Sequence, residues 1–143
     1  MTLVEVALAL AVVAVLVAIA LPLYSGYQYR GQVVQATNDI TSLAAQMEIY
    51  YHTHQQYPAS LADIGADTRV DPWGFPYQYI NHALVNGNGH VRRDRSLNPL
   101  NSDYDLYSVG RDGVSKYPIT QSESLDDVIR AQDGQYYGLA SDF

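Results

Sequence analysis

An uncharged apolar run near the start of the chain limits the folds that are available to it. No charged side chain occurs from Val6 to Tyr29, and every Lys and Arg lies at Arg30 or beyond. The stretch from Val6 to Leu23 reads VALALAVVAVLVAIALPL, and it falls within the roughly 17–25 apolar residues that a membrane-spanning helix needs. Such a helix must be buried by lipid or by copies of itself.

A cleaved signal peptide is the first alternative for this run. No basic residues precede it, and no small-residue cleavage pattern ends it. Helix-like sequence follows instead. The run is therefore predicted to be a retained anchor.

An apolar stripe continues the helical pattern beyond Pro22. Its members recur at steps of three and four: Val33, Ala36, Ile40, Leu43, Met47 and Tyr50. The pattern predicts one long helix from about residue 2 to about residue 54, apolar all round in its first half and amphipathic in its second. We therefore divide the chain into an apolar anchor, residues 1–29, and a globular head, residues 30–143, which includes the amphipathic second half of the helix.

Two residues are unusual for a plain anchor. Burying an unpaired Glu5 costs about 2.5–3.5 kcal/mol on insertion scales, so the carboxylate either lies at the headgroup level or awaits a cation. The nearest cation in sequence is the α-amino group of Met1, from the same chain or from a neighbour whose axial register the pair would set. Pro22 removes a backbone donor and is predicted to kink or loosen the helix near residues 18–21.

The remaining composition limits the partners and the stabilising chemistry. A formal net charge of −7 argues against nucleic acid as a partner. The one basic cluster, Arg92, Arg93 and Arg95, is interrupted by Asp94 and is predicted to be a solvated loop. The chain has no cysteine, which excludes disulfides and thiolate metal sites. A bound cation or neighbouring subunits are two candidates for stabilising the head.

The head reads as a series of short elements. Tyr57-Pro58 ends the long helix, and Ser60 is a candidate cap for a helical turn at 61–64 that contains Asp63. A type I turn is predicted at 71–74 and is followed by a strand that begins at Tyr77. Asn-Gly pairs at 86–87 and 88–89 favour hairpin turns, and residues 105–109 alternate as a second strand. The predicted fold class is α+β, with the helix against a small antiparallel sheet.

Catalytic motifs are not evident. His52 and His54 are two apart, so they lie on different faces of a helix and cannot chelate one metal. No Gly-x-Ser-x-Gly motif and no Gly-rich phosphate loop after a strand occurs. Trp73 is most simply an aromatic residue that packs against the helix, and the 13 tyrosines suit a half-buried sheet. We predict that the chain is not an enzyme.

The N-terminal sequence MTLVEVALALAVVAVLVAIALPLY resembles the signature of type IV pilin-like proteins, with residues 1–5 and Pro22 matching the pattern. The resemblance implies that a prepilin peptidase removes a short leader and that Met1 becomes the N-methylated first residue of the mature form. It also implies that Glu5 interacts with the amine of an adjacent subunit during assembly. Met1, Glu5 and Pro22 are therefore the predicted assembly residues.

Two head motifs narrow the resemblance. DPWGFPYQY at 71–79 and DLYSVGRDG at 105–113 are similar to motifs of the major pseudopilin of type II secretion systems. That family implies a long N-terminal helix packed on a small antiparallel sheet with a C-terminal loop. It implies a helical homopolymer that works with minor pseudopilins and an inner-membrane assembly platform. The precursor would be a single-pass inner-membrane protein, and the filament would be periplasmic or extracellular.

A calcium site is the cofactor that this resemblance suggests. Asp112 and the carbonyl of Val109 would be ligands, with Asp126 or Asp127 completing the site, since calcium prefers carboxylate and carbonyl oxygens. The stretch between Asp112 and Asp126 is long, and LDDVI at 125–129 replaces the usual family sequence. The alternative is a solvated acidic loop.

Two other functions stay open. A surface pilus for adhesion, motility or DNA uptake would use the same helix, although it commonly carries a cysteine pair that is missing here. A single-pass anchored enzyme or sensor would be monomeric and indifferent to Glu5.

Overall fold

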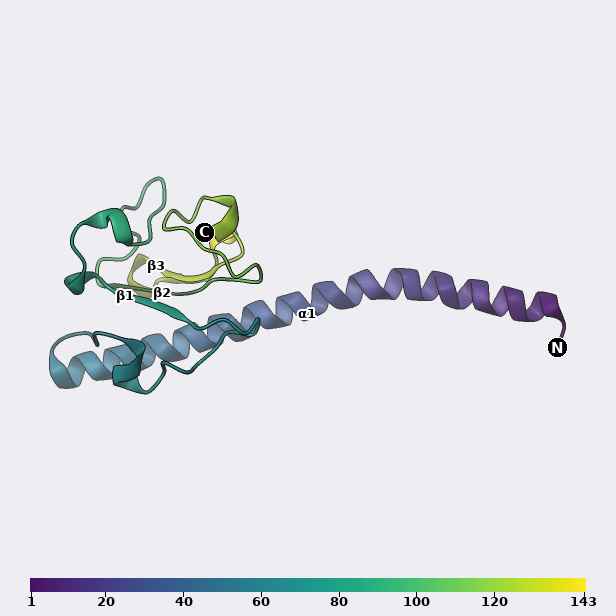
Figure 1. The fold of residues 1–143 in the computed structure, drawn as a ribbon, viewed down its shortest axis with the longest axis horizontal. Coiled ribbons are helices and arrows are strands. Elements are labelled where there is room, and N and C mark those ends of the chain that lie inside the picture. The colour runs from purple at the N-terminus through teal and green to yellow at the C-terminus, as the bar shows by residue number, and fades with distance from the viewer. The chain divides into compact units, whose positions relative to one another are not determined.

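The computed structural model describes residues 1–143, which form two units, Met1–Gln32 and Val33–Phe143. Helix α1, Leu3–His54, runs through both of them (Figure 1). The predicted range of about 2 to 54 is confirmed to within a residue. The helix ends where Gln55 adopts a φ of +56°, a left-handed conformation that cannot continue an α-helix.

The unit Met1–Gln32 consists almost entirely of helix. Every residue from 1 to 28 is exposed, and the helix is continuous through Pro22. The hydroxyl of Ser25 donates a hydrogen bond to the Pro22 carbonyl oxygen at 2.9 Å. The helix is long and apolar enough to span a membrane, which is consistent with an anchor.

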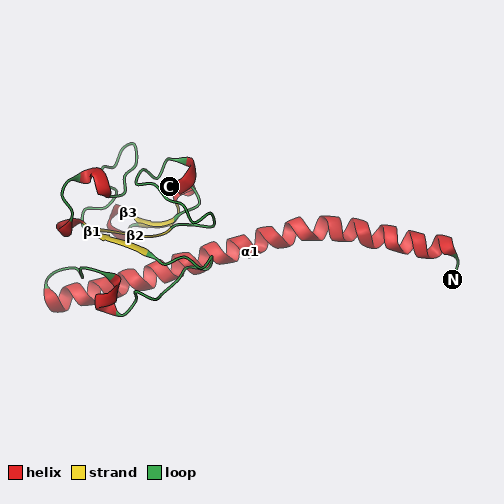
Figure 2. Cartoon of the chain, in the orientation of Figure 1, coloured by secondary structure: helices red, strands yellow, loops and turns green.

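The unit Val33–Phe143 contains one antiparallel sheet of order β1-β2-β3-β4. Its strands β1, β2 and β3 are labelled in Figure 2. Tyr79 faces Leu106 across the first pair of strands, and Ile129 faces Gly138 across the last pair. The strands are β1 Gln78–Asn81, β2 Tyr104–Ser108, β3 Val128–Ala131 and β4 Tyr136–Leu139.

The core of this unit lies on both faces of the sheet. On one face, Leu106 and Val128 pack against α1, whose buried residues are Ala36, Ile40, Leu43, Ala44 and Met47. On the other face, Tyr107 and Ile129 pack with residues of the covering loops and the C-terminus, Leu100, Ile119 and Ala140. The expected packing of the amphipathic half-helix on the sheet and the alternation along β2 are both confirmed. The fold is the predicted α+β, pilin-like arrangement.

Two short turns follow the sequence closely. The 3-10 turn Leu61–Ile64 has a capping box in which Asp63 Oδ2 accepts from the backbone N–H groups of Ala59 and Ser60 at 2.9 and 3.0 Å. At the predicted type I turn, Gly74 N donates to the Asp71 carbonyl oxygen at 3.0 Å. Trp73 is partly buried against the helix cluster, as expected.

The predicted hairpin at the Asn-Gly pairs is wrong. Asn88–His90 forms a 3-10 turn, and β1 pairs with β2, which begins only at Tyr104. The reason is a competing partner: Arg93 N donates to the Tyr117 carbonyl oxygen at 3.1 Å, and Ile119 N donates to the Arg93 carbonyl oxygen at 2.9 Å. The chain after the turn therefore pairs with the C-terminal loop rather than folding back on β1.

The predicted solvated state of the basic cluster is wrong for one member. Arg95 is exposed and Arg93 is half-buried, but Arg92 is only 1% exposed. The guanidinium of Arg92 is buried because it pairs with Asp127 at 2.6 Å.

Candidate functional site

The surface of the unit Met1–Gln32 is the first candidate site. Large apolar side chains are exposed all along it, among them Leu10 at 65%, Leu16 at 61% and Leu21 at 63%. Soluble monomers rarely expose apolar patches larger than a few hundred Å². In water this surface would carry a large hydrophobic penalty, so its function requires an apolar environment.

Glu5 has local partners in the single chain. Its Oε2 accepts hydrogen bonds from Thr2 N at 2.6 Å and from Thr2 Oγ1 at 3.0 Å. Glu5 N lies 3.3 Å from Thr2 Oγ1, so the two residues form a reciprocal cap at the start of α1. The ion pairs of the structure do not include one between Met1 and Glu5. Pairing with a neighbour's amine and methylation of Met1 both stay predictions.

Three of the residues predicted as calcium ligands, Val109, Asp112 and Asp126, lie near one another, and the alternative ligand Asp127 has another partner. Asp126 Oδ2 accepts from Asp112 N at 3.0 Å, and Asp112 Oδ1 accepts from Val114 N at 2.8 Å. The turn after Val109 lies close by, because a Cβ on Gly110 would come within 2.5 Å of the Asp126 carbonyl oxygen. Asp127 lies elsewhere, against Arg92, and no three His, Asp or Glu side chains form a group that could hold a metal.

Asp127 is fully buried in a polar cluster with Arg92. Its Oδ2 accepts from Arg92 Nη2 and from Ser115 Oγ, each at 2.6 Å. Burial raises the pKa of the Asp127 carboxyl to about 6, and the Arg92 charge opposes that rise. Asp127 Oδ2 therefore already accepts hydrogen bonds from the Arg92 guanidinium and the Ser115 hydroxyl. Of the two alternative carboxylates, Asp127 is therefore committed to Arg92, and a calcium site at Val109, Asp112 and Asp126 stays a prediction.

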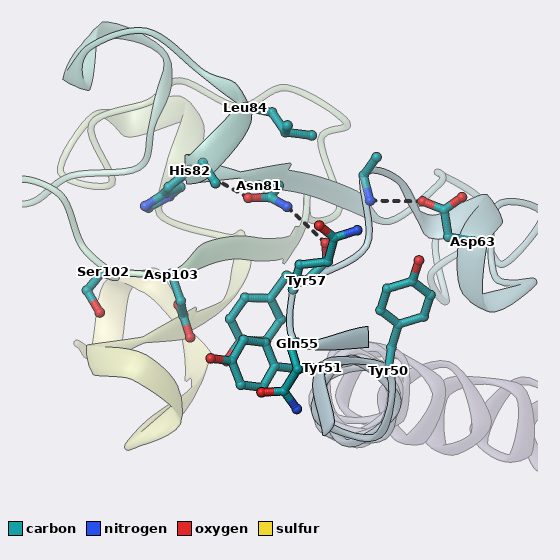
Figure 3. A pocket seen from close by; sticks show the side chains of 13 residues that line it. Tyr50, Tyr51, Gln55, Tyr57, Asp63, Asn81, His82, Leu84, Ser102 and Asp103 are labelled. Atoms are coloured by element: carbon teal, nitrogen blue, oxygen red, sulfur yellow. Dashed lines mark hydrogen bonds between the residues drawn. The ribbon is translucent and has the colours of Figure 1, made fainter. Parts of the chain in front are cut away.

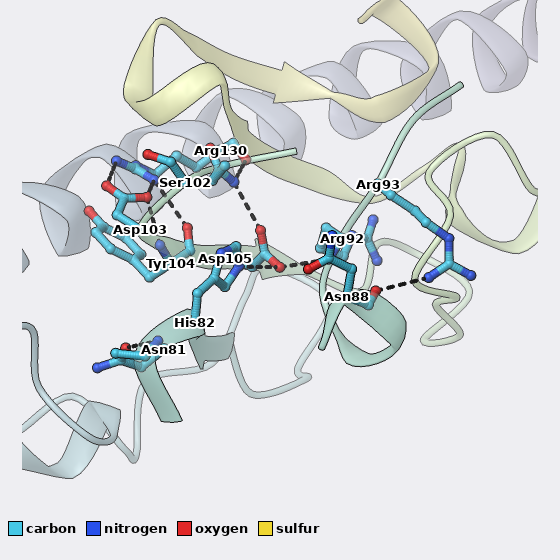
Figure 4. Close-up of polar contacts among 12 residues, drawn as sticks. Asn81, His82, Asn88, Arg92, Arg93, Ser102, Asp103, Tyr104, Asp105 and Arg130 are labelled. Atoms are coloured by element: carbon cyan, nitrogen blue, oxygen red, sulfur yellow. Dashed lines mark hydrogen bonds and ion pairs between the residues drawn. The ribbon is translucent and has the colours of Figure 1, made fainter. Parts of the chain in front are cut away.

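Two further carboxylate clusters, around the buried Asp105 and the partly buried Asp103, hold the head together (Figure 4). Asp105, which is fully buried, accepts from Arg92 N at 2.6 Å and from Asn101 Nδ2 at 3.0 Å, and His82 Nε2 lies 3.0 Å from it. Asp103 receives two hydrogen bonds of 2.8 Å from Arg130, whose guanidinium lies 4.0 Å from the centre of the Tyr104 ring. These contacts link separate parts of the head, and the buried Asp105 and Arg130 lie in its interior.

A cavity of about 700 Å³ lies between the end of α1 and the segment after β1 (Figure 3). Tyr51 and Tyr57 stack along one wall with ring centres 4.7 Å apart. Asn81 Nδ2 donates to the Tyr57 and Pro58 carbonyl oxygens at 3.3 and 3.0 Å, and its Oδ1 accepts from Ala83 N at 2.9 Å. The polar groups of Asn81 are thus used in holding the wall together.

The same cavity contains no nucleophile–base pair. The hydroxyl of Ser102 donates to Asp133 at 2.9 Å, whereas His82 faces Asp105. A serine nucleophile needs its base within roughly 2.6–3.2 Å. The lining is therefore not arranged for acyl transfer.

The buried Tyr77 and the partly buried Tyr79 serve as neutral hydrogen-bond donors. Burial raises the pKa of Tyr77, and its hydroxyl donates to Asp39 on α1 at 2.9 Å. Burial likewise raises the pKa of Tyr79, whose hydroxyl donates to the Pro58 carbonyl oxygen at 2.8 Å. Both phenols stay protonated at neutral pH and fix the sheet and the chain after the helix. This agrees with the structural role expected of the tyrosines.

Sequence reasoning missed the head's internal ions and its last two strands. Arg130 lies between the apolar residues of VIRA in β3, and that pattern hints at a buried cation. Asp133-Gly134 between two short apolar runs is a hairpin signal for β3 and β4. Nothing in the local sequence pairs Arg92 with Asp127, because they are 35 positions apart.

Known proteins similar to this chain belong to pilin-like systems. A fimbrial protein of Neisseria meningitidis serogroup A is 26% identical over 137 residues, covering 92% of this chain and 78% of the relative. The type II secretion system core protein G of Pseudomonas aeruginosa is 26% identical over 133 residues, covering 78% and 82%. Its counterpart in Dickeya chrysanthemi is 26% identical over 117 residues, covering 78% and 69%. No family model and no solved structure matches.

These relatives and the fold support a type IV pilin-like family for the chain. More particularly, they support a pilin-like filament subunit, because by their names the relatives are a fimbrial protein and secretion-system core proteins. Those names describe structural components rather than enzymes.

Proposed function

We propose that this chain is the major pseudopilin of a type II secretion system, assembled as a helical filament of identical subunits. The observation that carries the filament is the fully exposed apolar surface of residues 1–28. Neighbouring copies of the same segment would bury this surface in a filament core. The two head motifs and the similarity to core protein G favour secretion.

Glu5 is the proposed register residue of that filament. In the single chain its carboxylate is bound only by Thr2. In an apolar core a neighbour's α-amino group would neutralise it, and a subunit displaced by one turn would leave both charges unpaired. Minor pseudopilins, an assembly platform and a prepilin peptidase are the further partners that this proposal requires.

Substituting Glu5→Leu tests the proposal through assembly. We expect the variant to retain a folded head, shown by an unchanged melting temperature, and to lose filaments in electron micrographs. Asp142→Leu is the matched control, because Asp142 is an exposed carboxylate of the head. Normal filaments from the Glu5 variant would refute the role of Glu5.

A surface pilin is the second candidate, favoured by the match of the Neisseria fimbrial protein over 92% of the chain. Deleting the gene separates the two functions. A pseudopilin mutant retains exported proteins in the periplasm and keeps its surface pili, whereas a pilin mutant loses the pili and secretes normally. Neighbouring genes for a secretin and a secretion ATPase would support the first outcome.

A further inference from the structure

The strongest unassigned feature of the head is the buried guanidinium of Arg92. Its Nη1 donates to the Lys116 carbonyl oxygen at 2.9 Å and also contacts Ser115 Oγ, while Nη2 donates to Asp127 Oδ2 at 2.6 Å. The group therefore gathers a carbonyl, a hydroxyl and a carboxylate oxygen from two separate parts of the C-terminal loop. These are the same kinds of oxygen that a calcium ion collects.

The backbone of Arg92 fixes this cation to the sheet. Arg92 N donates to Asp105 Oδ2 on β2 at 2.6 Å, and the guanidinium carbon lies 4.2 Å from the centre of the Tyr107 ring. Arg92 is 1% exposed and Asp127 is fully buried, so water does not screen the pair. One side chain thus connects β2, the residues at 115–116 and the residue before β3.

We propose that Arg92 holds the C-terminal loop in place as a built-in cation, and that the head needs no bound metal ion for its stability. The guanidinium neutralises Asp127, which is one of the two alternative carboxylates that a calcium site in this loop could use. Arginine suits this role because its planar fork binds several oxygens at once and keeps its charge when buried. This inference concerns the head alone and holds whether or not the chain forms filaments.

Thermal unfolding of the full chain in detergent micelles tests the inference, with fluorescence of Trp73, the only tryptophan, reporting on the head. A metal ion that binds only the folded state raises the melting temperature, so calcium chloride and the chelator EGTA should each change the wild-type value by less than about 1 °C. A rise of several degrees with calcium would overturn the proposal.

Substitutions at Arg92 supply the second arm of the test. Breaking a buried ion pair is strongly destabilising, so Arg92→Met should lower the melting temperature by about 10 °C or more. The exposed neighbour Arg95 provides the control, and Arg95→Met should shift it by less than about 2 °C. Arg92→Lys keeps the charge but loses the planar guanidinium group. Its melting temperature should lie between those of the Arg92→Met and Arg95→Met variants. Equal melting temperatures for the Arg92→Met and Arg95→Met variants would contradict the role of Arg92.

If Arg92→Met alone fails to fold, a double variant still tests whether the loop depends on a bound metal ion. Arg92→Met with Asp127→Leu removes both charges and leaves no unpaired carboxylate in the interior. We expect it to fold and to melt above the single variant. A double variant that stays unfolded and is rescued by added calcium would show that the loop depends on a metal, against the proposal.

Discussion

The two units of the chain differ in the exposure of their apolar side chains and in the partners of their carboxylates. In Met1–Gln32 the only carboxylate, Glu5, is bound by a residue three positions away, and the apolar side chains are exposed. In Val33–Phe143 a core of apolar side chains is buried, and buried carboxylates have partners far along the chain, such as Asp127 with Arg92. The first unit therefore forms a regular helix but leaves its apolar surface without a packing partner. The second unit packs its own core and pairs its buried carboxylates internally.

This difference separates folding from assembly. Substitutions in the anchor should change what the chain binds without changing the stability of the head. Substitutions in the head should do the reverse, in proportion to how deeply the altered group is buried.

The largest expected difference between the units comes from one matched pair of leucines. Leu43→Ala should lower the free energy of unfolding of the head by about 2–5 kcal/mol, because Leu43 is fully buried against the sheet. Leu10→Ala should leave it unchanged, since Leu10 is exposed in the anchor. Urea titration followed by Trp73 fluorescence measures both. Equal losses would mean that the anchor contributes to the stability of the head.

A smaller effect is expected at Asp71, the buried residue that organises the turn before β1. Its carboxylate accepts from Trp73 N at 3.0 Å, Phe75 N at 2.9 Å and Ser108 Oγ at 2.5 Å. Asp71→Ala leaves these donors without their acceptor and should cost about 1–3 kcal/mol in the same titration. Asp67→Ala, at an exposed carboxylate, is the control, and a loss as large as that at Asp71 would argue against this explanation.

The smallest effect is expected at the half-exposed ion pair between Arg69 and Asp39 on α1. The two side chains are 34% and 25% exposed, and the nitrogen and oxygen lie 2.9 Å apart. Because water screens the pair, Arg69→Met should cost less than about 1 kcal/mol. Urea titration of the Arg69→Met and Arg92→Met variants measures the two losses of unfolding free energy, and so compares a partly solvated ion pair with a buried one. A loss at Arg69 equal to that at Arg92 would mean that burial does not set the strength of these pairs.

Features that depend on neighbouring residues could be predicted from the sequence. The apolar stripe from Val33 to Tyr50 predicted the helix and its buried face. Ser60 and Asp63 predicted the cap of the turn at 61–64. Helix periodicity and caps act over a few residues, so a single sequence contains them in full.

Features that depend on distant partners could not be predicted in this way. The chain after Asn88 pairs with the loop near Tyr117 rather than turning back on β1, and Arg92 is neutralised by a carboxylate that follows much later. Local turn propensity favoured a hairpin there, but the tertiary contacts of the C-terminal loop override it. The proposed assembly site at Glu5 also depends on a distant partner, because the partner that we propose for Glu5 belongs to another molecule.

Electron cryo-microscopy of the assembled protein tests the central claim most directly. We expect a helical filament in which the segments Met1–Gln32 of neighbouring subunits pack together along the axis, with each Glu5 carboxylate beside the α-amino group of another subunit. Native protein that occurs only as single molecules, with this segment surrounded by lipid or detergent alone, would contradict it.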